Sequence, residues 1–421
     1  MRIYFSGIGG VGIGPLAQIA LDAGYDIAGS DQAASLTTTQ LLDQGVTVAI
    51  GEQTGEYLRQ QHAEAPLDYF VYTAALPADH PELVAAHELG VMCLKRDGII
   101  ARIISERGLQ MIACAGTHGK TTTSGLMVWV MKQLGIPVSY AVGTTLSFGP
   151  SGAYDSESKY FVYECDEYDR NFLHYTPALS VISSIDYDHP DTYPTLDDYQ
   201  AAFRAFIEQS DRTYLWCKDA DVLDAHLASS DVTVFDESTS LAHIHLPGLH
   251  LRQNAFLVER AIRKLFPDVP YHDLVAAINS FPGTDRRMEL LDDNLYSDYG
   301  HHPAEIRATL SAARELADYV VLVYQPHQNV RQHMIRDEYT DEIFADADEV
   351  YWLPTYLSRE DPELDVLSPA ELTRHLSGTI HPAELDDDLW SAIQTARNDG
   401  KLVLAMGAGD IDSWLRQRLS A

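Results

Sequence analysis

One stretch orders the whole sequence, and it reads Ala113-Cys-Ala-Gly-Thr-His-Gly-Lys-Thr-Thr-Thr123. The apolar run Met111 to Cys114 leads into it and predicts a buried strand. The residues from Ser124 to Leu134 follow it and repeat apolar side chains at helical spacing. A strand, a glycine-bounded turn with Lys-Thr, and a helix are together typical of a phosphate-binding loop. In such a loop, backbone N–H groups and the helix N-terminus hold anionic oxygens.

Lys120 adds a point charge to this loop, and the hydroxyl group of Thr121 is suited to ligate Mg²⁺. The match to the common pattern G-x-x-x-x-G-K-[ST] is incomplete, because Cys114 occupies the position of the first glycine. The plain alternative is an ordinary glycine-containing turn. We favour the phosphate loop because Lys-Thr stands where a helix must begin.

The composition limits the class of protein. The chain has 421 residues, enough for two or three domains of ~100–200 residues each, and 46% of its residues are hydrophobic. It has no apolar run of ~18 residues, so a membrane span is not expected. The chain starts directly with an expected strand rather than a secretion signal. Its four cysteines lie far apart, which indicates a reducing cytoplasm and argues against a structural zinc site.

The net charge is −33, with 62 acidic against 29 basic residues. This charge disfavours nucleic acid and an anionic membrane surface as partners. We therefore expect small-molecule partners. The chain is expected to be a monomer or homodimer, and the sequence does not decide between them. An enzyme that handles phosphates with such a charge must gather its few cations at the site.

A second glycine-rich turn lies near the N-terminus. Residues Gly7-Ile-Gly-Gly-Val-Gly12 stand between an expected strand, Met1–Phe5, and an expected helix, Pro15–Asp22. This pattern, G-x-G-x-x-G, is typical of a dinucleotide or phosphate site. Asp31 follows the next apolar strand, Tyr25–Ala28, and is placed to accept a hydrogen bond from a ribose hydroxyl. Taken alone, the pattern suggests a nicotinamide-dependent dehydrogenase.

Further expected strands and helices alternate along residues 1–108, which predicts a parallel sheet wound with helices. The expected strands are Val46–Ile50, Tyr69–Thr73 and Val91–Cys93. Lys95-Arg96 closes this region. The pair either reaches an anionic ligand or forms a solvated helix start, and both interpretations stay open.

Acidic residues and a histidine follow two further expected strands. Glu164-Cys-Asp-Glu-Tyr-Asp169 comes after the strand Tyr160–Glu164, and Asp186-Tyr-Asp-His-Pro190 comes after Leu179–Ile185. The carboxyl ends of parallel strands are where such folds bind ligands. Together with Thr121 these side chains predict a Mg²⁺ site. The alternatives are a solvated charge run and a histidine held by hydrogen bonds, since histidine is an unusual ligand for Mg²⁺.

These motifs, in this order, resemble those of the Mur ligases, which are ATP-dependent amide-forming enzymes of peptidoglycan assembly. The segments that carry the resemblance are Gly116–Thr122, Glu164–Asp169 and Asp188-His-Pro-Asp-Thr-Tyr193. The chain looks most similar to the branch that joins L-alanine to UDP-N-acetylmuramate. The resemblance implies ATP and Mg²⁺ as cofactors, with UDP-N-acetylmuramate and L-alanine as the other small-molecule partners.

The resemblance also implies roles for residues of the central region. Thr121, Glu164 and His189 match the residues that surround the metal ions. The expected ATP-binding loop consists of Gly116, Thr117, His118, Gly119, Lys120, Thr121 and Thr122. The segment Gly248–Ala255 resembles the family's adenine-contact segment, and Asn254 matches its second asparagine. Two positions depart from the family pattern: Leu251 replaces the first asparagine, and Gln200 stands where many relatives carry a lysine, carbamoylated in some.

The last region, 283–421, resembles the family's third domain. Arg286 and Asp298 match residues that face the nucleotide, and Tyr299 and His301 match residues that line the amino-acid site. Gln325-Pro-His-Gln-Asn-Val-Arg331 is similar to a segment of the alanine-adding branch. It implies that His327 and Arg331 hold the amino acid, with Arg331 on its carboxylate. Gln328 replaces an arginine of some relatives, so alanine, serine and glycine all stay open as the amino acid.

The expected fold is therefore α/β with three domains. They are a Rossmann-like UDP-sugar-binding domain at 1–108, a central ATPase domain with a parallel sheet at 109–282, and a Rossmann-like amino-acid-binding domain at 283–421. The expected catalytic residues are Lys120, Glu164, His189, His301 and Arg331. The expected UDP-sugar contacts are Gly9, Gly10, Val11, Gly12, Asp31 and Thr73.

Three other functions stay open. The first is a ligase of the same family that recycles a whole peptide onto UDP-N-acetylmuramate, although Gln-Pro-His and Arg331 favour a free amino acid. The second is an NAD-dependent dehydrogenase, which would leave Gly116–Thr122 unexplained. The third is a non-catalytic relative of the ligases, which the complete metal set opposes.

Overall fold

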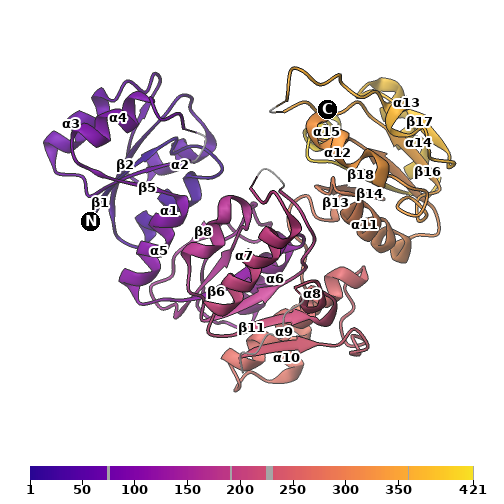
Figure 1. The fold of residues 1–421 in the computed structure, drawn as a ribbon, viewed down its shortest axis with the longest axis horizontal. Helices are drawn as coiled ribbons and strands as arrows, with labels where there is room; N and C mark the ends of the chain where they lie inside the picture. Colours follow the sequence, from indigo (N-terminus) through magenta and orange to yellow (C-terminus); the bar gives the residue numbers. More distant parts are fainter. Residues whose placement is uncertain (74–75, 190–191, 224–230, 359, 421) are drawn as a thin grey trace. The chain divides into compact units, whose positions relative to one another are not determined.

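The computed structural model describes residues 1–73, 76–189, 192–223, 231–358 and 360–420. Its contacts divide the chain into two compact units. The first consists of residues 1–240 and 257–280, and the second of residues 241–256 and 281–421. Figure 1 shows helices and strands alternating along the chain. They form three mostly parallel sheets, which confirms the expected three-domain α/β class.

The first sheet has the strand order β3-β2-β1-β4-β5, and all of its pairs are parallel. Its strands are β1 (Arg2–Ser6), β2 (Asp26–Asp31), β3 (Thr47–Ile50), β4 (Tyr69–Tyr72) and β5 (Met92–Lys95). The helices of this region are α1 (Gly14–Asp22), α2 (Leu36–Asp43), α3 (Glu56–Glu64), α4 (Pro81–Glu88) and α5 (Arg96–Arg107). The strands expected from the sequence form here, and their ends differ from the predicted ones by at most three residues.

A buried carboxylate on α4 ties this helix to the first sheet. Glu82 is 1% exposed and accepts hydrogen bonds from three hydroxyl groups, those of Tyr4 (2.7 Å), Ser6 (2.6 Å) and Ser30 (2.6 Å). The three donors come from β1 and β2. Because an unmatched polar group inside a core is costly, this cluster fixes how α4 lies against the strands.

The second sheet has the order β12-β11-β10-β6-β9-β7-β8, with only the β7–β8 pair antiparallel among the described pairs. Its strands are β6 (Gln110–Ala115), β7 (Ser139–Ala141), β8 (Gly152–Ala153), β9 (Tyr160–Glu164), β10 (Leu179–Ile182), β11 (Thr213–Trp216) and β12 (Val232–Phe235). The helices here are α6 (Lys120–Gln133), η1 (Tyr168–His174), α7 (Leu196–Glu208), α8 (Cys217–Val222) and α10 (Tyr271–Asn279). Helix α9 (Leu249–Leu265) contributes residues to both units. The order places β6 between β10 and β9.

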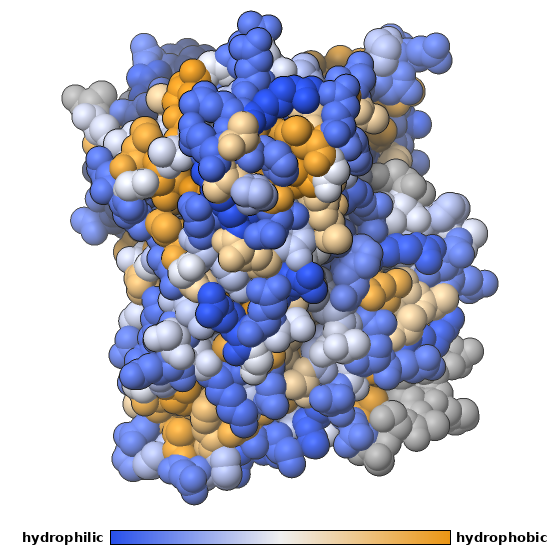
Figure 2. All heavy atoms as spheres, turned by 90° about the vertical axis from the view of Figure 1, so that its left-hand side faces the viewer, coloured by the Kyte–Doolittle hydropathy of each residue, from blue (hydrophilic) through white to orange (hydrophobic). Residues whose placement is uncertain are grey.

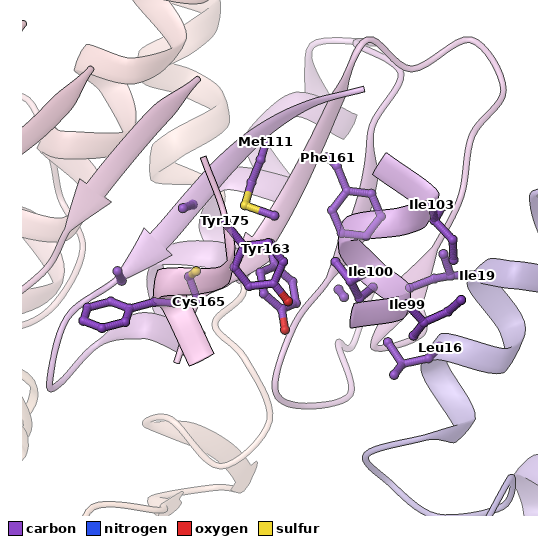
Figure 3. Packing of buried hydrophobic residues seen from close by; sticks show 14 of the residues in the cluster. Leu16, Ile19, Ile99, Ile100, Ile103, Met111, Phe161, Tyr163, Cys165 and Tyr175 are labelled. Atoms are coloured by element: carbon purple, nitrogen blue, oxygen red, sulfur yellow. The ribbon is translucent and has the colours of Figure 1, made fainter. Parts of the chain in front are cut away.

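One hydrophobic core joins the first two sheets within the first unit. Figure 3 shows Leu16 and Ile19 of α1, Ile99 and Ile103 of α5, and Phe161 of β9 among the side chains of one buried cluster. All five side chains belong to a single cluster of buried residues. Burial of each such side chain contributes about 1.5–3 kcal/mol, so the two sheets are held together by apolar packing.

The third sheet lies in the second unit and has the order β13-β14-β18-β15-β16-β17. The pair β13–β14 is antiparallel, and the other pairs are parallel. Its strands are β13 (Glu289–Asp292), β14 (Leu295–Asp298), β15 (Val320–Tyr324), β16 (Glu349–Trp352), β17 (Ile380–Pro382) and β18 (Leu402–Met406). Its helices are α11 (Pro303–Leu316), α12 (Asn329–Ile335), η2 (Arg336–Glu338), α13 (Pro369–Leu372), α14 (Asp387–Asn398) and α15 (Ile411–Ser420).

The surface is polar, as the composition predicts. On the face that Figure 2 shows, hydrophilic side chains predominate, and hydrophobic ones form separate groups. In the described parts of the chain, no helix has both the length and the apolar character needed to cross a membrane. The cysteines are free thiols, and two of them, Cys114 and Cys165, are buried.

Replacing Glu82 by alanine should lower the free energy of unfolding by about 3 kcal/mol, because three hydroxyl groups lose their buried acceptor. Urea denaturation followed by circular dichroism measures this change. Glu88→Ala is the matched control, since Glu88 lies on the same helix and forms an exposed ion pair with Arg59. Equal losses in the two variants would contradict the structural role of Glu82.

Candidate active site

The loop after β6 passes close to the residues that follow β10, and this closeness explains its first glycine. At Gly116 a Cβ atom would lie 2.6 Å from Oγ of Ser183 and 2.8 Å from the carbonyl oxygen of Ser184. The backbone φ of Gly116 is 128°, a value that residues with side chains rarely adopt. A side chain at this position is therefore excluded by both space and backbone geometry.

The loop is fastened at its start, and a helix begins at its end. The N–H of Thr117 donates to the carbonyl of Ser184 at 2.9 Å, and the N–H of His118 donates to the hydroxyl of Ser184 at 2.9 Å. Gly119 has φ 81° and caps α6, which starts at Lys120 as predicted. The N-terminal turn of a helix presents unpaired N–H groups and a partial positive charge, so this arrangement suits a phosphate group.

Lys120 lies folded into its own loop. Its Nζ donates to the carbonyl of Gly116 at 2.8 Å and to that of Thr117 at 3.1 Å. It also forms an ion pair with Oε2 of Glu167 at 2.8 Å. Burial alone would lower the pKa of Lys120, but the carboxylates of Glu167 and Asp166 outweigh burial and raise it. The ammonium group is therefore charged at neutral pH.

Glu167 is a site residue that the sequence did not single out within Glu164–Asp169. Its side chain is 0% exposed, and burial raises its pKa while the adjacent Lys120 ammonium group opposes the increase. In the structure, burial alternates from the end of β9 onward, so that Tyr163, Cys165 and Glu167 are buried while Asp166 is exposed.

Thr121 and Glu164, two of the three expected metal ligands, are in contact. The hydroxyl of Thr121 donates to Oε1 of Glu164 at 2.9 Å, and Oε2 accepts from the N–H of Gly143 at 2.6 Å. A hydroxyl and a carboxylate are oxygen ligands of the kind Mg²⁺ prefers, and Mg²⁺ usually keeps several waters and substrate phosphate oxygens besides. These residues therefore fit the ion.

His189, the third expected ligand, lies beside Glu167, with its Nε2 3.7 Å from Oε1 of that residue. Its backbone φ is 58°, and its ring makes an edge contact with Tyr168. Within the described ranges, no group of three His, Cys, Asp or Glu side chains converges as a metal cluster would. Pro190 and Asp191, which belong to the same motif, lie outside the described residues.

The N-terminal glycine loop is closed by Asp31, at the end of β2. The N–H of Gly9 donates to Oδ2 of Asp31 at 2.8 Å. A Cβ atom at Gly9 would lie 2.6 Å from Oγ of Ser35, which caps α2. The Asp31 carboxylate thus supports the loop itself, and its contact with a ribose stays a prediction. Thr73 directly follows β4 at the same edge of the sheet.

Arg96 places a cation at this loop. Its guanidinium Nη1 lies 3.7 Å from the point where a Cβ atom of Gly12 would be. This contact favours the anionic-ligand interpretation for Arg96, whereas Lys95 forms an ion pair with Asp169 at 3.3 Å.

A pocket of about 550 Å³ opens beside the ends of β2 and β3. Its lining residues are Gln32, Gly51, Glu52, Gln53, Thr54, His80 and Pro81. Ligand pockets of about 300–1,000 Å³ hold small molecules. The pocket and the glycine loop belong to the same edge of the first sheet, because Gln32 directly follows Asp31.

In the second unit, the expected amino-acid residues come from two loops at one edge of the third sheet. Tyr299 and His301 follow β14, and their rings lie 5.8 Å apart. His327 follows β15, and its ring lies 5.7 Å from that of His301. The ring of Tyr356, which the sequence did not indicate, stacks on His327 at 5.8 Å. The structure therefore brings three of the four expected residues into one aromatic cluster.

His301 is neutral at physiological pH. Burial lowers its pKa to about 4, and Arg331 adds to the decrease while Glu305 opposes it. Its Nδ1 lies 3.2 Å from the carbonyl oxygen of Tyr299, which only accepts, so Nδ1 carries the proton. This tautomer leaves Nε2 as a hydrogen-bond acceptor.

The expected nucleotide residues of the second unit are held by backbone contacts. Asp298 is buried and accepts from the N–H groups of Gly300 (2.8 Å) and Met288 (2.9 Å), and burial raises its pKa. Arg286 donates to the carbonyl of Gly407 at 2.7 Å and lies 4.6 Å from the centre of the Tyr299 ring. Asn254 is buried on α9.

The three departures from the family pattern fall at structured positions. Gln200 lies on α7 and donates to the carbonyl of Val222 at 2.7 Å. Leu251 lies near the start of α9. Gln328 has φ 62°, and its N–H donates to the carbonyl of Tyr356 at 2.9 Å. The Gln328 backbone thus joins the two loops that carry His327 and Tyr356.

Comparison with known proteins gives matches along the whole chain. Residues 2–107 match the family profile described as "Mur ligase family, catalytic domain". Residues 114–243 match "Mur ligase middle domain", and residues 286–409 match "Mur ligase, glutamate ligase domain".

Similar curated proteins include UDP-N-acetylmuramate–L-alanine ligases. The one from Streptomyces avermitilis is 32% identical over 451 residues, covering 97% of this chain and 95% of the relative. The one from Nitrosospira multiformis is 32% identical over 468 residues, covering 97% and 92%.

Solved structures share the fold. The UDP-N-acetylmuramate-alanine ligase of Thermotoga maritima has a TM-score of 0.77 at 23% identity, covering 100% of this chain and 98% of that one. A murein peptide ligase of Psychrobacter arcticus has a TM-score of 0.62 at 22% identity, with the same coverage. The full-length relatives at 32% identity, together with profiles for all three regions, show that the chain belongs to the Mur ligase family.

Proposed function

We propose that this chain is an ATP-dependent ligase that joins L-alanine to the carboxylate of UDP-N-acetylmuramate, a step of peptidoglycan precursor synthesis in the cytoplasm. The observation that carries the proposal is the loop of Lys120 and Thr121 at the start of α6, with the carboxylate of Glu164 on the Thr121 hydroxyl. Full-length relatives with that name support the choice of substrates.

In the proposed reaction the substrate carboxylate attacks the terminal phosphate of ATP, giving an acyl phosphate and ADP. The amino group of alanine then attacks the acyl carbon, an amide bond forms, and phosphate leaves. The charge on the transferred phosphoryl group is stabilised by Lys120 and by the N–H groups at the start of α6. Thr121 and Glu164, with His189 as a further ligand, would hold Mg²⁺, and the bound ion would supply additional charge neutralisation.

The amino-acid half of the proposal concerns the cluster of Tyr299, His301 and His327. Arg331 binds the alanine carboxylate through paired hydrogen bonds. His301 is suited to the amino group, since its neutral ring offers Nε2 as an acceptor. An N–H of the attacking amine donates to that atom, which turns the nitrogen lone pair toward the acyl phosphate.

The UDP-sugar half concerns the first sheet. We propose that Gly9, Gly10, Val11 and Gly12 hold the diphosphate, with Arg96 as the adjacent cation. Asp31, Thr73 and the neighbouring pocket then take the nucleoside end. The proposed domains are 1–108 for UDP-sugar, 109–282 for ATP and 283–421 for the amino acid. Arg286, Asp298 and Asn254 are proposed to bind the nucleotide from the third domain and from α9.

Lys120→Ala should lower phosphate release with ATP, UDP-N-acetylmuramate and L-alanine by about 10²–10³-fold, the usual effect of losing one group that stabilises transition-state charge. Lys132→Ala is the matched control, because Lys132 lies on the same helix but contacts Tyr140. A phosphate-release assay compares the two. Wild-type turnover in the Lys120 variant would refute the ATP half of the proposal.

Arg331→Ala should raise KM for alanine about 10–100-fold, because it removes charge-assisted hydrogen bonds worth about 1.5–3 kcal/mol. KM for UDP-N-acetylmuramate should stay within experimental error. Arg307→Ala serves as the control, since Arg307 forms an exposed ion pair with Glu342. An unchanged KM for alanine in the Arg331 variant would remove this residue from the amino-acid site.

Phosphate release with different amine substrates separates this function from peptide recycling, which fold similarity to murein peptide ligases keeps as the second candidate. We expect L-alanine to give a higher kcat/KM than serine, glycine or the tripeptide L-alanyl-γ-D-glutamyl-meso-diaminopimelate. Preference for the tripeptide would assign the chain to recycling. Wild-type protein that releases phosphate with none of these amines would indicate a non-catalytic relative.

A further inference from the structure

All N–H donors of the Lys120 ammonium group have hydrogen-bond acceptors within the protein. Its Nζ donates to the carbonyls of Gly116 and Thr117 and to Oε2 of Glu167, at 2.8, 3.1 and 2.8 Å. An ammonium group has three N–H donors, and these acceptors use all three. A phosphate oxygen that binds Lys120 must therefore replace at least one of them.

Glu167 is the charged acceptor of this set, and its position is fixed. Its side chain is 0% exposed. Its backbone carbonyl accepts from the hydroxyl of Tyr193 at 2.6 Å and from the N–H of Arg170 at 3.0 Å. Tyr193 is fully buried as well. These contacts hold the Glu167 backbone next to the loop.

A bound phosphate and Glu167 draw on the same ammonium group, and both are anions. The exchange of partners opposes phosphate binding in two ways. Glu167 loses a charge-assisted hydrogen bond, and its buried carboxylate is left beside a second negative group. His189 lies 3.7 Å from the same carboxylate and is too distant for a hydrogen bond that would replace Lys120.

We propose that Glu167 is a positioning residue for Lys120, which holds the ammonium group inside its loop and competes with the nucleotide phosphates for it. The inference rests on the proposed function, since it takes this loop to be the nucleotide site. Removing the Glu167 charge should therefore tighten nucleotide binding. It should also slow turnover, because a neutral partner holds Lys120 less firmly in the direction from which it reaches the phosphates.

Isothermal titration calorimetry with ADP, in EDTA and again in Mg²⁺, tests the competition. Glu167→Gln keeps the shape of the side chain and an amide oxygen for Lys120 but removes the charge. We expect ADP to bind about tenfold more tightly, which corresponds to about 1.4 kcal/mol. In the same variant kcat for phosphate release should fall. A variant that only damaged the fold would weaken ADP binding together with turnover.

Asp169→Asn is the matched control. It removes one negative charge from the same segment, but Asp169 is exposed and pairs with Lys95 rather than with Lys120. Its backbone φ of 53° is one that asparagine tolerates. ADP affinity should stay at the wild-type value. Equal tightening in the Glu167 and Asp169 variants would indicate a general effect of charge and overturn the proposal.

Glu167→Asp covers the case in which Glu167→Gln does not fold, as judged by thermal melting. It keeps the charge but shortens the side chain by one methylene group, so it should hold Lys120 less tightly and bind ADP more tightly than the wild type. Wild-type or weaker affinity in the folded Glu167 variants overturns this inference alone. If the wild-type protein binds no ADP in either buffer, the proposed function itself fails.

Discussion

Three adjacent parallel strands, β10, β6 and β9, end at one edge of the second sheet, and the chemistry of the candidate site depends on that constraint. In a parallel sheet, the segments that follow neighbouring strands meet at the carboxyl edge. Lys120 follows β6, Glu167 follows β9, and His189 follows β10. The close approach at Gly116 demands a residue without a side chain.

Most of the fold could be predicted from the sequence, because alternating strands and helices with glycine turns leave few arrangements of a parallel sheet. The start of α6 at Lys120 follows from local rules alone. The partner of Lys120 does not, because several carboxylates lie together in the sequence and only packing decides which one is buried. Tyr356 was missed for the same reason, since it contacts a segment distant in sequence. The same limit of prediction applies to Glu82, outside the candidate site. In the sequence Glu82 looks like an ordinary acidic residue at a helix start, but in the structure three hydroxyl groups converge on its carboxylate.

Because the chain is strongly negative, the binding of anionic substrates depends on the few cations at the candidate site. ATP and a UDP-sugar are anions, and a surface with a net charge of −33 repels them over about one Debye length, roughly 8 Å at physiological ionic strength. Within that distance, the local electrostatic potential is determined by single cations next to the glycine turns. Lys120 and Arg96 occupy such positions. Glu167 offsets part of this local charge, because Lys120 forms a buried ion pair with it.

The hydrophobic core that the first two sheets share constrains the distance between their two glycine loops. Leu16 and Ile99 belong to the same apolar cluster as Phe161, so the glycine loop at Gly9 and the phosphate loop at Lys120 are parts of one packed body. A reaction between a group bound at the first loop and a phosphate bound at the second gains from this fixed spacing. The two reactants need not find each other by diffusion, an advantage worth up to about 7–11 kcal/mol for well-oriented groups. The apolar packing of α1 and α5 against β9 thus affects the reaction rate as well as the stability of the fold. A substitution that leaves a cavity in this packing would change both.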